Sequence, residues 1–359
     1  MRLLITIPNF CREAGGAESF AVTVSQGLAS RGHAMHVAAL TGEATNGIIV
    51  HKVSSLADAE KLRAEIKPDL VLDWGLNIRA DVHRLGGGTH REFLHYKLLA
   101  SHYLLRPFKA IDLRLRPKHR CLIAAERKLL ADPQARYIAV SNFVKKQLQN
   151  TAAIDDARIR VLHNGVDVAR MQRECGARAL RPELGIGEND IFCLFVAHNL
   201  QLKNFALLRR IFQRLYPHIP ELKLVVLGKH RPRTQADWLV YAGAVEDPTR
   251  FYQAADILLH PTYYDACSNT VLEALAAECV VISSDLNGSA EIISSGDNGF
   301  VLPVTKGESL RIWSDLIARL AQDRRARQKI SRAASELARQ CDIQNYLTRL
   351  ENVLTEFTG

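Results

Sequence analysis

The chain has 359 residues, more than one hydrophobic core usually spans, so two domains of about 150–180 residues are expected. With 47% hydrophobic and 24% charged residues, 21 Gly and 12 Pro, the composition excludes a collagenous, disordered or disulfide-scaffold chain. The formal net charge of +9 is uneven, because residues 79–128 alone hold 12 basic and 4 acidic residues. Such a concentration indicates a local anionic partner.

The cysteines and the apolar runs indicate a compartment. Seven cysteines, none spaced as Cys-x-x-Cys, favour reduced thiols in the cytosol over a zinc site or a set of disulfides. The opening apolar stretch is shorter than the roughly 7–15 residues of a secretory signal core, and no run approaches the ~20 residues of a membrane span. We therefore expect a cytoplasmic protein.

The first half of the chain alternates short apolar runs with helical stretches. Strands are predicted at Leu3–Ile7, Met35–Leu40, Leu70–Leu72 and Tyr137–Val140, and helices at Ala17–Ser30, Leu56–Ile66, Arg120–Leu130 and Asn142–Leu148. Apolar strands without alternation, separated by helices, are typical of a parallel sheet covered on both faces.

The second half repeats this pattern independently. Strands are predicted at Phe192–Ala197, Leu222–Leu227, Leu239–Tyr241, Ile257–Leu259 and Val280–Ser283, and helices at Asn204–Leu215, Pro248–Ala254 and Asn269–Ala277. The weakly periodic segment Gly165–Gly187 is interpreted as a linker. The chain is expected to be helical from Lys306 onward.

These patterns predict an α/β fold with two Rossmann-like, doubly wound domains facing a cleft, where ligands normally bind. An N-terminal domain is expected over residues 1–168 and a C-terminal domain over residues 169–341. A last helix, at Ile343–Phe357 within residues 342–359, is expected to pack back on the first domain.

The strongest motif follows the predicted strand Ile257–Leu259. Asp265 and Glu273 lie eight residues apart across a junction of loop and helix, and Asn269 is placed to cap that helix. Free N–H groups at the start of a helix favour a phosphate or a sugar oxygen, and Glu273 is able to accept hydrogen bonds from a vicinal diol. The alternative is an acidic residue that merely complements the helix dipole.

The stretch from Ala255 to Glu291 resembles the nucleotide-sugar site of retaining GT-B glycosyltransferases of family 4. His163-Asn164-Gly165-Val166-Asp167 is similar to the family's domain junction, and Gly15-Gly16-Ala17-Glu18 to its N-terminal glycine turn. Within the family, the segments Gly228–Arg233 and Gly87–Arg91 are most similar to the bacterial lipopolysaccharide core glucosyltransferase I group. The resemblance spans nearly the whole chain, and it implies that residues 1–168 form the acceptor-side domain and residues 169–341 the nucleotide-sugar-binding domain.

The resemblance implies a role for each matching residue. Glu273 would bind the ribose hydroxyls, and Asp265, in place of the usual Glu, would contact a hydroxyl of the donor sugar. The other implied donor contacts are Gly15, Gly16, Gly243, Ala244, Val245, Ala266, Cys267, Ser268, Asn269 and Thr270.

Lys203 matches the family lysine that holds the diphosphate in an R-x4-K pattern or an adjacent R-K pair. The arginine is missing beside it, since Gln201 and Leu202 occupy the nearby positions, and Arg231 or Arg209 is the expected substitute. The leaving diphosphate needs cationic stabilisation. No Asp-x-Asp motif is present, so no metal and no cofactor are expected beyond a nucleotide-sugar co-substrate, a UDP-sugar.

On the acceptor side, His90 is the candidate that faces the transferred sugar, and Arg91 the candidate contact to an acceptor phosphate. The basic window continues with apolar and aromatic residues interleaved, as in segments that lie on anionic lipid. Its candidate acceptor or membrane contacts are Arg91, Arg106, Lys109, Arg114, Arg116, Lys118 and Arg120. The alternative is a solvated helix face.

The resemblance thus implies a retaining hexosyltransferase, moving glucose from UDP-glucose onto a lipopolysaccharide core or a related phosphorylated glycolipid at the inner face of the cytoplasmic membrane. Transfer in capsule, exopolysaccharide or O-antigen synthesis is the alternative within the family. A nicotinamide-dependent dehydrogenase is disfavoured because no G-x-G-x-x-G follows a predicted strand. A nucleic-acid binder would leave Lys203, Asp265 and Glu273 unexplained.

Overall fold

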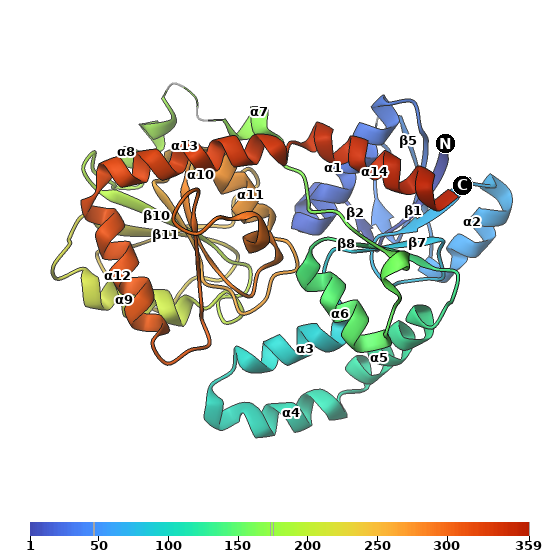
Figure 1. Cartoon of the computed structure of the whole chain (residues 1–359), viewed down its shortest axis with the longest axis horizontal. Helices are drawn as coiled ribbons and strands as arrows, with labels where there is room; N and C mark the ends of the chain where they lie inside the picture. Colours follow the sequence, from blue (N-terminus) through green and yellow to red (C-terminus); the bar gives the residue numbers. More distant parts are fainter. Residues whose placement is uncertain (46, 173, 175, 359) are drawn as a thin grey trace. The chain divides into compact units, whose positions relative to one another are not determined.

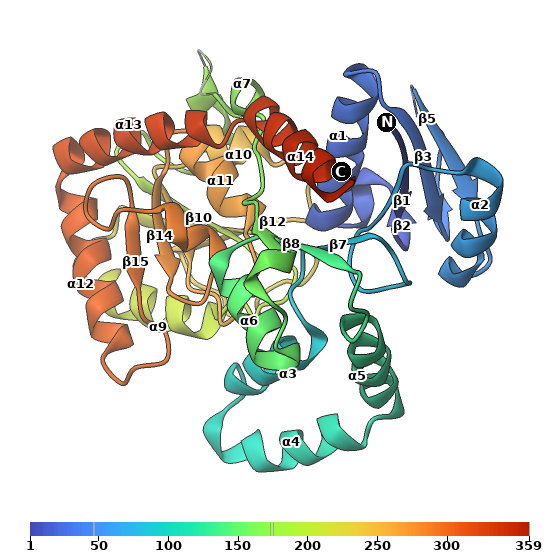
Figure 2. The same ribbon diagram turned by 45° about the vertical axis from the view of Figure 1, so that its right-hand side comes forward.

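The computed structural model describes residues 1–45, 47–172, 174 and 176–358, and Cys175 therefore lies outside the described residues. Contacts divide the chain into two units. Unit 1 comprises Met1–His95, Leu105–Asn164 and Gln344–Gly359, and unit 2 comprises Tyr96–Leu104 and Gly165–Ile343. Figures 1 and 2 show the elements of both.

Unit 1 is built on a parallel sheet in the order β5-β3-β1-β6-β7-β8-β9. Its strands are β1 (Arg2–Thr6), β3 (Ala34–Ala39), β5 (Ile48–Lys52), β6 (Leu70–Asp73), β7 (Val82–Leu85), β8 (Arg136–Ala139) and β9 (Ile159–Val161), and β2 (Asn9–Phe10) pairs with β4 (Thr41–Gly42) separately. The central strand β1 is apolar, with Leu3, Leu4 and Ile5 fully buried. Burial on both faces explains why its hydrophobic residues do not alternate with polar ones.

The helices of unit 1 differ in two places from the prediction. The helix expected over Leu56–Ile66 begins as a 3-10 turn at Leu56–Asp58 and continues as α2 (Ala59–Ile66). The basic window forms three helices, α3 (His90–Leu99), α4 (Arg106–Leu115) and α5 (Pro117–Leu130). The others are α1 (Gly16–Ser30), α6 (Asn142–Ala152) and α14 (Ile343–Thr358).

The last helix, α14, packs on α1. The rings of Tyr346 and Phe20 lie 5.1 Å apart, edge to face, and Arg31 forms an ion pair of 2.7 Å with Glu351. Gly27 provides the space for the buried side chain of Leu347. The C-terminal helix is therefore an integral part of the core of unit 1.

A buried arginine on β7 links this helix to the end of the unit. The guanidinium of Arg84 lies over the ring of Trp74, 4.2 Å from its centroid, and donates to the Asn164 side chain and to the Tyr346 hydroxyl. A buried cation needs polar partners or aromatic faces to replace its hydration. Arg84 thereby ties the first residues of the His163–Asp167 motif to the core of unit 1.

Unit 2 is built on a second parallel sheet, in the order β12-β11-β10-β13-β14-β15. Its strands are β10 (Ile191–Val196), β11 (Leu222–Leu227), β12 (Leu239–Gly243), β13 (Ile257–His260), β14 (Val280–Ser284) and β15 (Phe300–Leu302). Gly228 ends β11 with a φ of +149°, where a Cβ would collide with the Ala197 carbonyl oxygen. Only glycine permits β10 and β11 to approach so closely at this edge.

Helices cover both faces of this sheet, as two separate apolar clusters show. One cluster contains residues of α9 (Phe205–Leu215) and α12 (Ser309–Gln322). The other contains residues of α10 (Thr249–Ala254), α11 (Asn269–Ala276) and α13 (Arg324–Gln340). This three-layer arrangement is that of a doubly wound α/β domain.

The segment Gly165–Gly187 is not the irregular linker that its weak periodicity predicts. It contains the short helices α7 (Val168–Met171) and α8 (Leu180–Glu183). Arg181 is buried there and donates 2.7 Å to the carboxylate of Asp256. This ion pair joins residues far apart in the sequence, and the local periodicity of the segment does not reveal such a contact.

Candidate active site

The candidate donor residues follow the two strands at which the topology of unit 2 reverses. β10 lies between β11 and β13, so the chain winds one way through β10, β11 and β12 and the other way through β13, β14 and β15. The loop with Lys203 follows β10, and the loop with Asp265 follows β13. Loops at the carboxyl ends of such neighbouring strands form the ligand site of doubly wound domains.

The loop after β10 is held by its own asparagines. The Asn199 side chain accepts hydrogen bonds from the backbone N–H groups of Gln201 (3.1 Å) and Leu202 (3.0 Å). Asn204 adopts a left-handed conformation (φ +62°) and caps α9 by accepting from the Leu207 N–H. Lys203 is thereby fixed one residue before the cap, with its side chain directed to the next loop.

Lys203 and Asp265 are brought together. The Nζ atom of Lys203 lies 2.5 Å from Oδ2 of Asp265, and both side chains are about 20% exposed. Burial alone would raise the pKa of the Asp265 carboxyl, but Lys203 and His260 outweigh it and hold that pKa well below its usual range. The carboxylate is therefore ionised at neutral pH.

His260 completes this group, and the sequence motif did not single it out. Its Nε2 atom lies 3.3 Å from Oδ2 of Asp265, and its side chain is 1% exposed. Burial, and then the charge of Lys203, lower the pKa of His260 to about 4. The imidazole is consequently neutral beside the ion pair at physiological pH.

The start of α11 differs in one respect from the prediction. The helix begins at Asn269, so Ser268 and not Asn269 occupies the N-cap position, and the Ser268 side chain makes no capping hydrogen bond. Instead, Asn287 accepts from the Ser268 N–H (3.3 Å), and Ser289 donates to the Ser268 carbonyl (3.0 Å). Asn287 and Ser289, which follow β14, therefore hold the loop before α11 in place. The N–H groups at the start of a helix are favourable partners for a ligand oxygen.

The candidate donor contacts around this start differ in exposure. Ala266, Cys267 and Ser268 are buried, so they offer peptide groups and not side chains. Asn269 and Thr270 are partly exposed. This pattern of exposure agrees with a ligand that contacts the backbone peptide groups of the loop.

Glu273 lies one turn into α11 and contacts Tyr252 of α10. Burial raises the pKa of the Glu273 carboxyl, while a hydrogen bond from Tyr252 and the charge of Arg170 act in the opposite direction. Tyr252 is 1% exposed and is therefore a fixed support for Glu273. Sequence reasoning missed it because a tyrosine on a buried helix face resembles an ordinary core residue.

A histidine that precedes Lys203 is influenced by basic neighbours. Desolvation and the charges of Lys229, Lys203 and His230 lower the pKa of His198. His198 stands five residues before Lys203, at the position that the R-x4-K spacing gives to arginine. The R-x4-K spacing is the sequence signal that could have identified His198 as a candidate site residue.

Arg231 and Arg209, the two arginines expected as substitutes, stay predictions. Arg209 is exposed on α9. The guanidinium of Arg231 lies 5.7 Å from the centroid of the Tyr241 ring. Lys229, next to the tight glycine Gly228, is the basic residue after β11 that faces the His198 group.

The predicted base contact lies at the end of β12. Gly243 has a φ of +82°, and its carbonyl accepts from the Gly228 N–H (2.8 Å). Ala244 is exposed and Val245 is partly exposed directly after it. The turn is therefore fixed at the same sheet edge as Lys229.

The candidates on unit 1 are the donor contacts Gly15 and Gly16 and the acceptor-side residue His90. Gly15 precedes α1 with an extended backbone, and a Cβ there would meet only the Glu18 carboxylate, while Gly16 begins the helix. His90 begins α3, and its Nε2 atom lies 3.1 Å from Nδ1 of His119 on α5. The roles proposed for these residues stay predictions.

The remaining basic candidates are distributed over three helices. Arg91 is exposed on α3, Arg106, Lys109 and Arg114 lie on α4, Arg116 precedes α5, and Lys118 and Arg120 lie in α5's first turns. Arg116 pairs with Asp112 at 2.8 Å, and the other side chains are exposed or partly exposed. They follow one another along the segment from α3 to α5.

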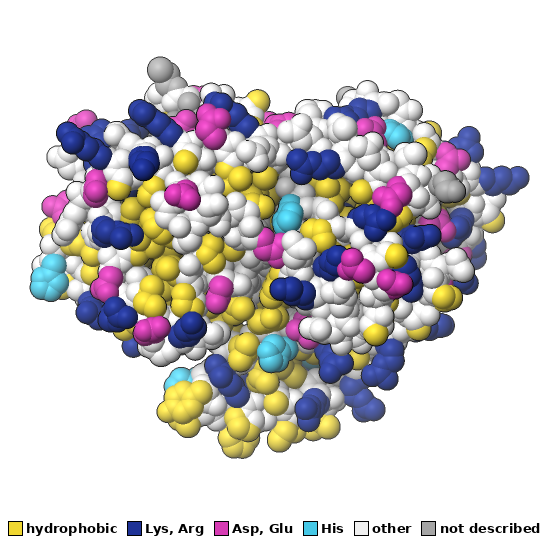
Figure 3. Space-filling view, viewed as in Figure 1, with side chains coloured by type: hydrophobic (Ala, Val, Ile, Leu, Met, Phe, Trp, Pro, Cys, Tyr) yellow, Lys and Arg dark blue, Asp and Glu magenta, His cyan; other side chains and the backbone are white. Residues whose placement is uncertain are grey.

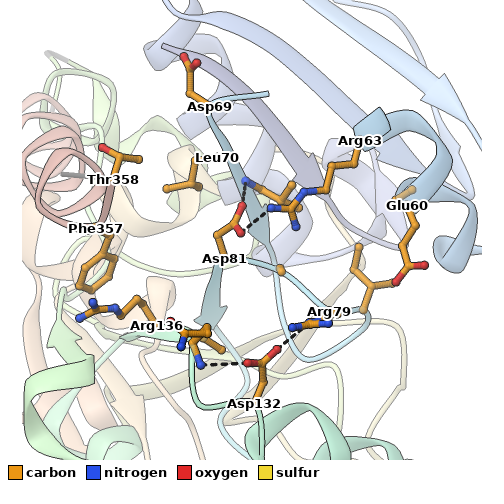
Figure 4. A pocket seen from close by; sticks show the side chains of 16 residues that line it. Glu60, Arg63, Asp69, Leu70, Arg79, Asp81, Asp132, Arg136, Phe357 and Thr358 are labelled. Atoms are coloured by element: carbon orange, nitrogen blue, oxygen red, sulfur yellow. Dashed lines mark hydrogen bonds and ion pairs between the residues drawn. The ribbon is translucent and has the colours of Figure 1, made fainter. Parts of the chain in front are cut away.

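A large cavity of about 680 Å³ lies at the opposite edge of the unit 1 sheet, where β6 and β8 begin (Figure 4). Arg63 pairs there with Asp81 at 2.7 Å, and Arg79 with Asp132 at 2.8 Å. The Arg136 guanidinium lies over the Phe357 ring. None of the predicted site residues lines this cavity, whose charges largely pair with one another.

Two absences apply to the part of the chain that the structure describes. No three His, Cys, Asp or Glu side chains are grouped so that they could hold a metal ion. No helix in these described ranges combines the length and the apolar character needed to cross a membrane.

Comparison with known proteins agrees with this geometry. The family model "Glycosyl transferases group 1" matches residues 177–337, and "Glycosyltransferase Family 4" matches residues 14–170. Together they cover most of the chain, which also has the two Rossmann-like domains of the GT-B fold. The chain belongs to the family 4 glycosyltransferases of GT-B fold.

Among known sequences, a D-inositol 3-phosphate glycosyltransferase of Kribbella flavida is 26% identical over 251 residues, which are 62% of this chain and 58% of that protein. The capsular polysaccharide biosynthesis glycosyltransferase CapM of Staphylococcus aureus is 25% identical over 209 residues, 54% of each chain. This chain thus aligns with little more than half the length of these relatives.

Among solved structures, WaaG, a glycosyltransferase involved in lipopolysaccharide biosynthesis, is similar with a TM-score of 0.81 and 18% identity over 98% of this chain and 99% of that one. HepE of Anabaena in complex with UDP-glucose has a TM-score of 0.75 and 15% identity over 99% and 100% of the two chains. Identities this low establish the shared fold alone.

Proposed function

We propose that the protein transfers a hexose, glucose from UDP-glucose, with retention of configuration onto a lipopolysaccharide core or a related cell-envelope glycolipid. The observation that carries this proposal is the group formed by Lys203, Asp265 and the start of α11 at the switch point of unit 2. It combines a cation for a diphosphate, a carboxylate for a sugar hydroxyl and helix N–H groups for a phosphate oxygen.

In this proposal each group of unit 2 contacts one part of the donor. Glu273, supported by Tyr252, accepts hydrogen bonds from the ribose hydroxyls. Lys203 moves from Asp265 to the diphosphate, and the released carboxylate accepts a hydrogen bond from the transferred sugar. The Lys203–Asp265 pair therefore keeps both groups ionised and positioned until the donor replaces their mutual contact.

Lys203 and Lys229 supply the cationic stabilisation of the leaving diphosphate, His198 adds to it when protonated, and no metal ion is needed in this proposal. Negative charge develops on the leaving oxygen in the transition state, and fixed cations close to it lower the barrier. The leaving oxygen itself then takes the acceptor proton on the front face of the sugar. Such a transfer retains the configuration and requires no protein base.

The acceptor class rests on relatives and on charge. WaaG acts in lipopolysaccharide biosynthesis, and HepE was solved with UDP-glucose. Residues 79–128 of this chain carry a net charge of +8, which would attract the phosphate groups of a phosphorylated glycolipid. The alternative acceptor is a capsular polysaccharide precursor, which the similarity to CapM favours. Membership in a glycosyltransferase family replaces the dehydrogenase alternative.

We also propose that the protein binds peripherally to the inner face of the cytoplasmic membrane through α4. Hydrophobic side chains with Lys and Arg beside them gather on this helix, at the bottom of the view in Figure 3. Phe108, Ile111 and Leu115 are exposed by 72%, 57% and 68%. Their spacing places them on one face of the helix, as in helices that lie in a lipid interface.

The donor assignment is tested by measuring the binding of UDP, GDP and ADP and the hydrolysis of their glucose conjugates. We expect UDP to bind and UDP-glucose to be hydrolysed, with Glu273→Ala weakening UDP by at least about 100-fold, the cost of two lost hydrogen bonds to a charged group. Glu278→Ala, in the turn after α11, is the matched control. Undiminished UDP affinity in Glu273→Ala would refute the assignment, and the anomer first seen by proton NMR decides between retention and inversion.

A further inference from the structure

A small cavity of about 210 Å³ lies beside the glycine-rich turn of unit 1. It is lined by the turn itself, by the start of α3 and by α5: Leu76, Gly87, Gly88, Thr89, His90, Phe93, Leu122 and Glu126. Gly88 has a φ of +70°, a conformation that glycine adopts without strain, and it brings Thr89 to the start of α3. The cavity is smaller than the roughly 300–1,000 Å³ of pockets for drug-sized ligands, which limits it to a small group.

The carboxylate of Glu126 is the most unusual group in this cavity. Its side chain reaches from α5 to the start of α3, where it accepts 2.5 Å from the His90 N–H, and the residue is only 5% exposed. Burial raises the pKa of this carboxyl, the repulsion from Glu92 adds to the effect, and the Arg91 charge and the two backbone N–H groups oppose it. A buried acceptor of this kind disfavours an anionic ligand and favours hydroxyl groups.

The other walls complement a hydroxylated ring. The imidazole of His90 is oriented by its 3.1 Å contact with His119, and Thr89 adds a hydroxyl. Phe93, whose ring lies 6.1 Å from that of His90, provides an apolar wall, as does Leu122. A pyranose has polar edges and apolar faces, so a carboxylate and an imidazole beside an aromatic ring suit it.

We propose that this cavity binds one neutral sugar ring of the acceptor, with Glu126 accepting hydrogen bonds from its hydroxyl groups and Phe93 packing on its face. This inference rests on the proposed glycosyltransferase function and specifies the acceptor side of it. The exposed guanidinium of Arg91 lies on the same helix turn as His90 and contacts a phosphate carried next to that ring.

The test titrates methyl α-D-glucopyranoside, methyl α-D-galactopyranoside and methyl α-D-mannopyranoside into the whole protein and follows binding by NMR, with inorganic phosphate as the contrasting ligand. We expect at least one glycoside to bind and Glu126→Gln to weaken it by at least about 10-fold, because a hydrogen bond to a charged group is lost. Glutamine still accepts from the His90 N–H, so the contact between α5 and α3 persists. Glu92→Gln, which removes the same charge from the adjacent helix without lining the cavity, should leave the affinity within about 2-fold.

A second variant guards against a folding defect. Leu122 is 42% exposed at the rim, so Leu122→Trp fills the cavity without disturbing the core, and we expect it to abolish glycoside binding. Equal glycoside affinity in the wild type, Glu126→Gln and Leu122→Trp would overturn the proposal, as would a cavity that binds phosphate and no glycoside. Binding of UDP, measured in parallel, should be unchanged in all variants, and its absence from the wild type would refute the proposed function and not this cavity.

Discussion

His198 shows how a single residue can decide the donor chemistry. It stands five residues before Lys203, where the spacing R-x4-K gives the family an arginine, and it lies among Lys203, Lys229 and His230. Arginine is charged at every physiological pH, whereas histidine is charged only below its pKa. Because desolvation and these three cationic neighbours lower the pKa of His198 from 6.5, the imidazole is neutral at pH 8.

This substitution predicts a pH-dependent donor affinity. As the pH falls toward and below 6.5, His198 gains a proton, and a diphosphate beside it is bound more tightly. We expect the affinity for UDP-glucose, whose diphosphate does not titrate in this range, to rise several-fold from pH 8 to pH 5.5. His198→Arg should bind UDP-glucose about 10-fold more tightly at pH 8, the effect of one charge-assisted hydrogen bond, and should lose most of the pH dependence.

Calorimetric titration at several pH values measures both effects. His218→Arg makes the same exchange in the turn after α9 and should leave the affinity and its pH dependence unchanged. Affinities that are independent of pH in the wild type and equal in His198→Arg would show that residue 198 does not meet the diphosphate.

The sequence predicts those candidate site residues that belong to a recognisable local motif. Lys203 and Asp265 are 62 positions apart, each matches its own motif for the proposed donor site, and in the structure they lie 2.5 Å apart. His260 and Tyr252 were not predicted, since their importance depends on burial against a charged partner. Periodicity along one helix or strand does not record such a contact.

At the scale of elements, strands made of apolar residues were predicted well, whereas a buried strand that contains polar residues was missed. The strand expected at Leu222–Leu227 agrees with β11, four others are shifted by one residue, three are one residue short at one end, and the strand expected at Leu239–Tyr241 is two residues shorter than β12. β7 was not predicted, because it reads Val-His-Arg-Leu, and its polar residues His83 and Arg84 are buried by tertiary partners. His83 lies 3.2 Å from the Asp73 carboxylate, which no local pattern reveals.

The contact between α1 and α14 yields a stability prediction. A Cβ at Gly27 would collide with the side chain of Leu347, which is 1% exposed and cannot turn away freely. In a helix, Gly→Ala by itself is stabilising by up to about 1 kcal/mol, whereas overpacking costs about 1–3 kcal/mol. We expect Gly27→Ala to destabilise the wild type by about 1 kcal/mol but to stabilise a Leu347→Ala protein.

The two changes should therefore couple by at least about 1 kcal/mol in a double-mutant cycle measured by calorimetry. Gly32→Ala is a poor control, because Gly32 has a φ of +89° and is strained by any side chain. Ser19→Ala is a better control, since Ser19 lies in α1 eight residues before Gly27, about two helical turns away, and is partly exposed. Additive effects of Gly27→Ala and Leu347→Ala would mean that α14 shifts to make room.

At the scale of the whole molecule, the uneven charge connects the sequence to a surface. Residues 171–359 hold equal numbers of basic and acidic residues, so the excess of positive charge resides in the first half. The donor candidates Lys203, Asp265 and Glu273 lie in the balanced part and the exposed α4 face in the basic part. This division suits the proposed membrane-bound acceptor, because attraction of the basic part to anionic lipid then does not compete with the binding of an anionic donor.

The membrane proposal predicts flotation with vesicles that contain anionic lipid and none with neutral phosphatidylcholine vesicles. Phe108→Ser, Ile111→Ser and Leu115→Ser combined should weaken the binding by at least about 100-fold, because each buried large apolar side chain contributes roughly 1.5–3 kcal/mol when fully desolvated. Ile49→Ser, which removes an exposed apolar side chain on β5, is the matched control. Since basic residues supply the remaining attraction, raising the salt concentration should release the wild type from the vesicles. Equal flotation with neutral and anionic vesicles, or undiminished flotation of the triple variant, would show that α4 does not dock on the membrane.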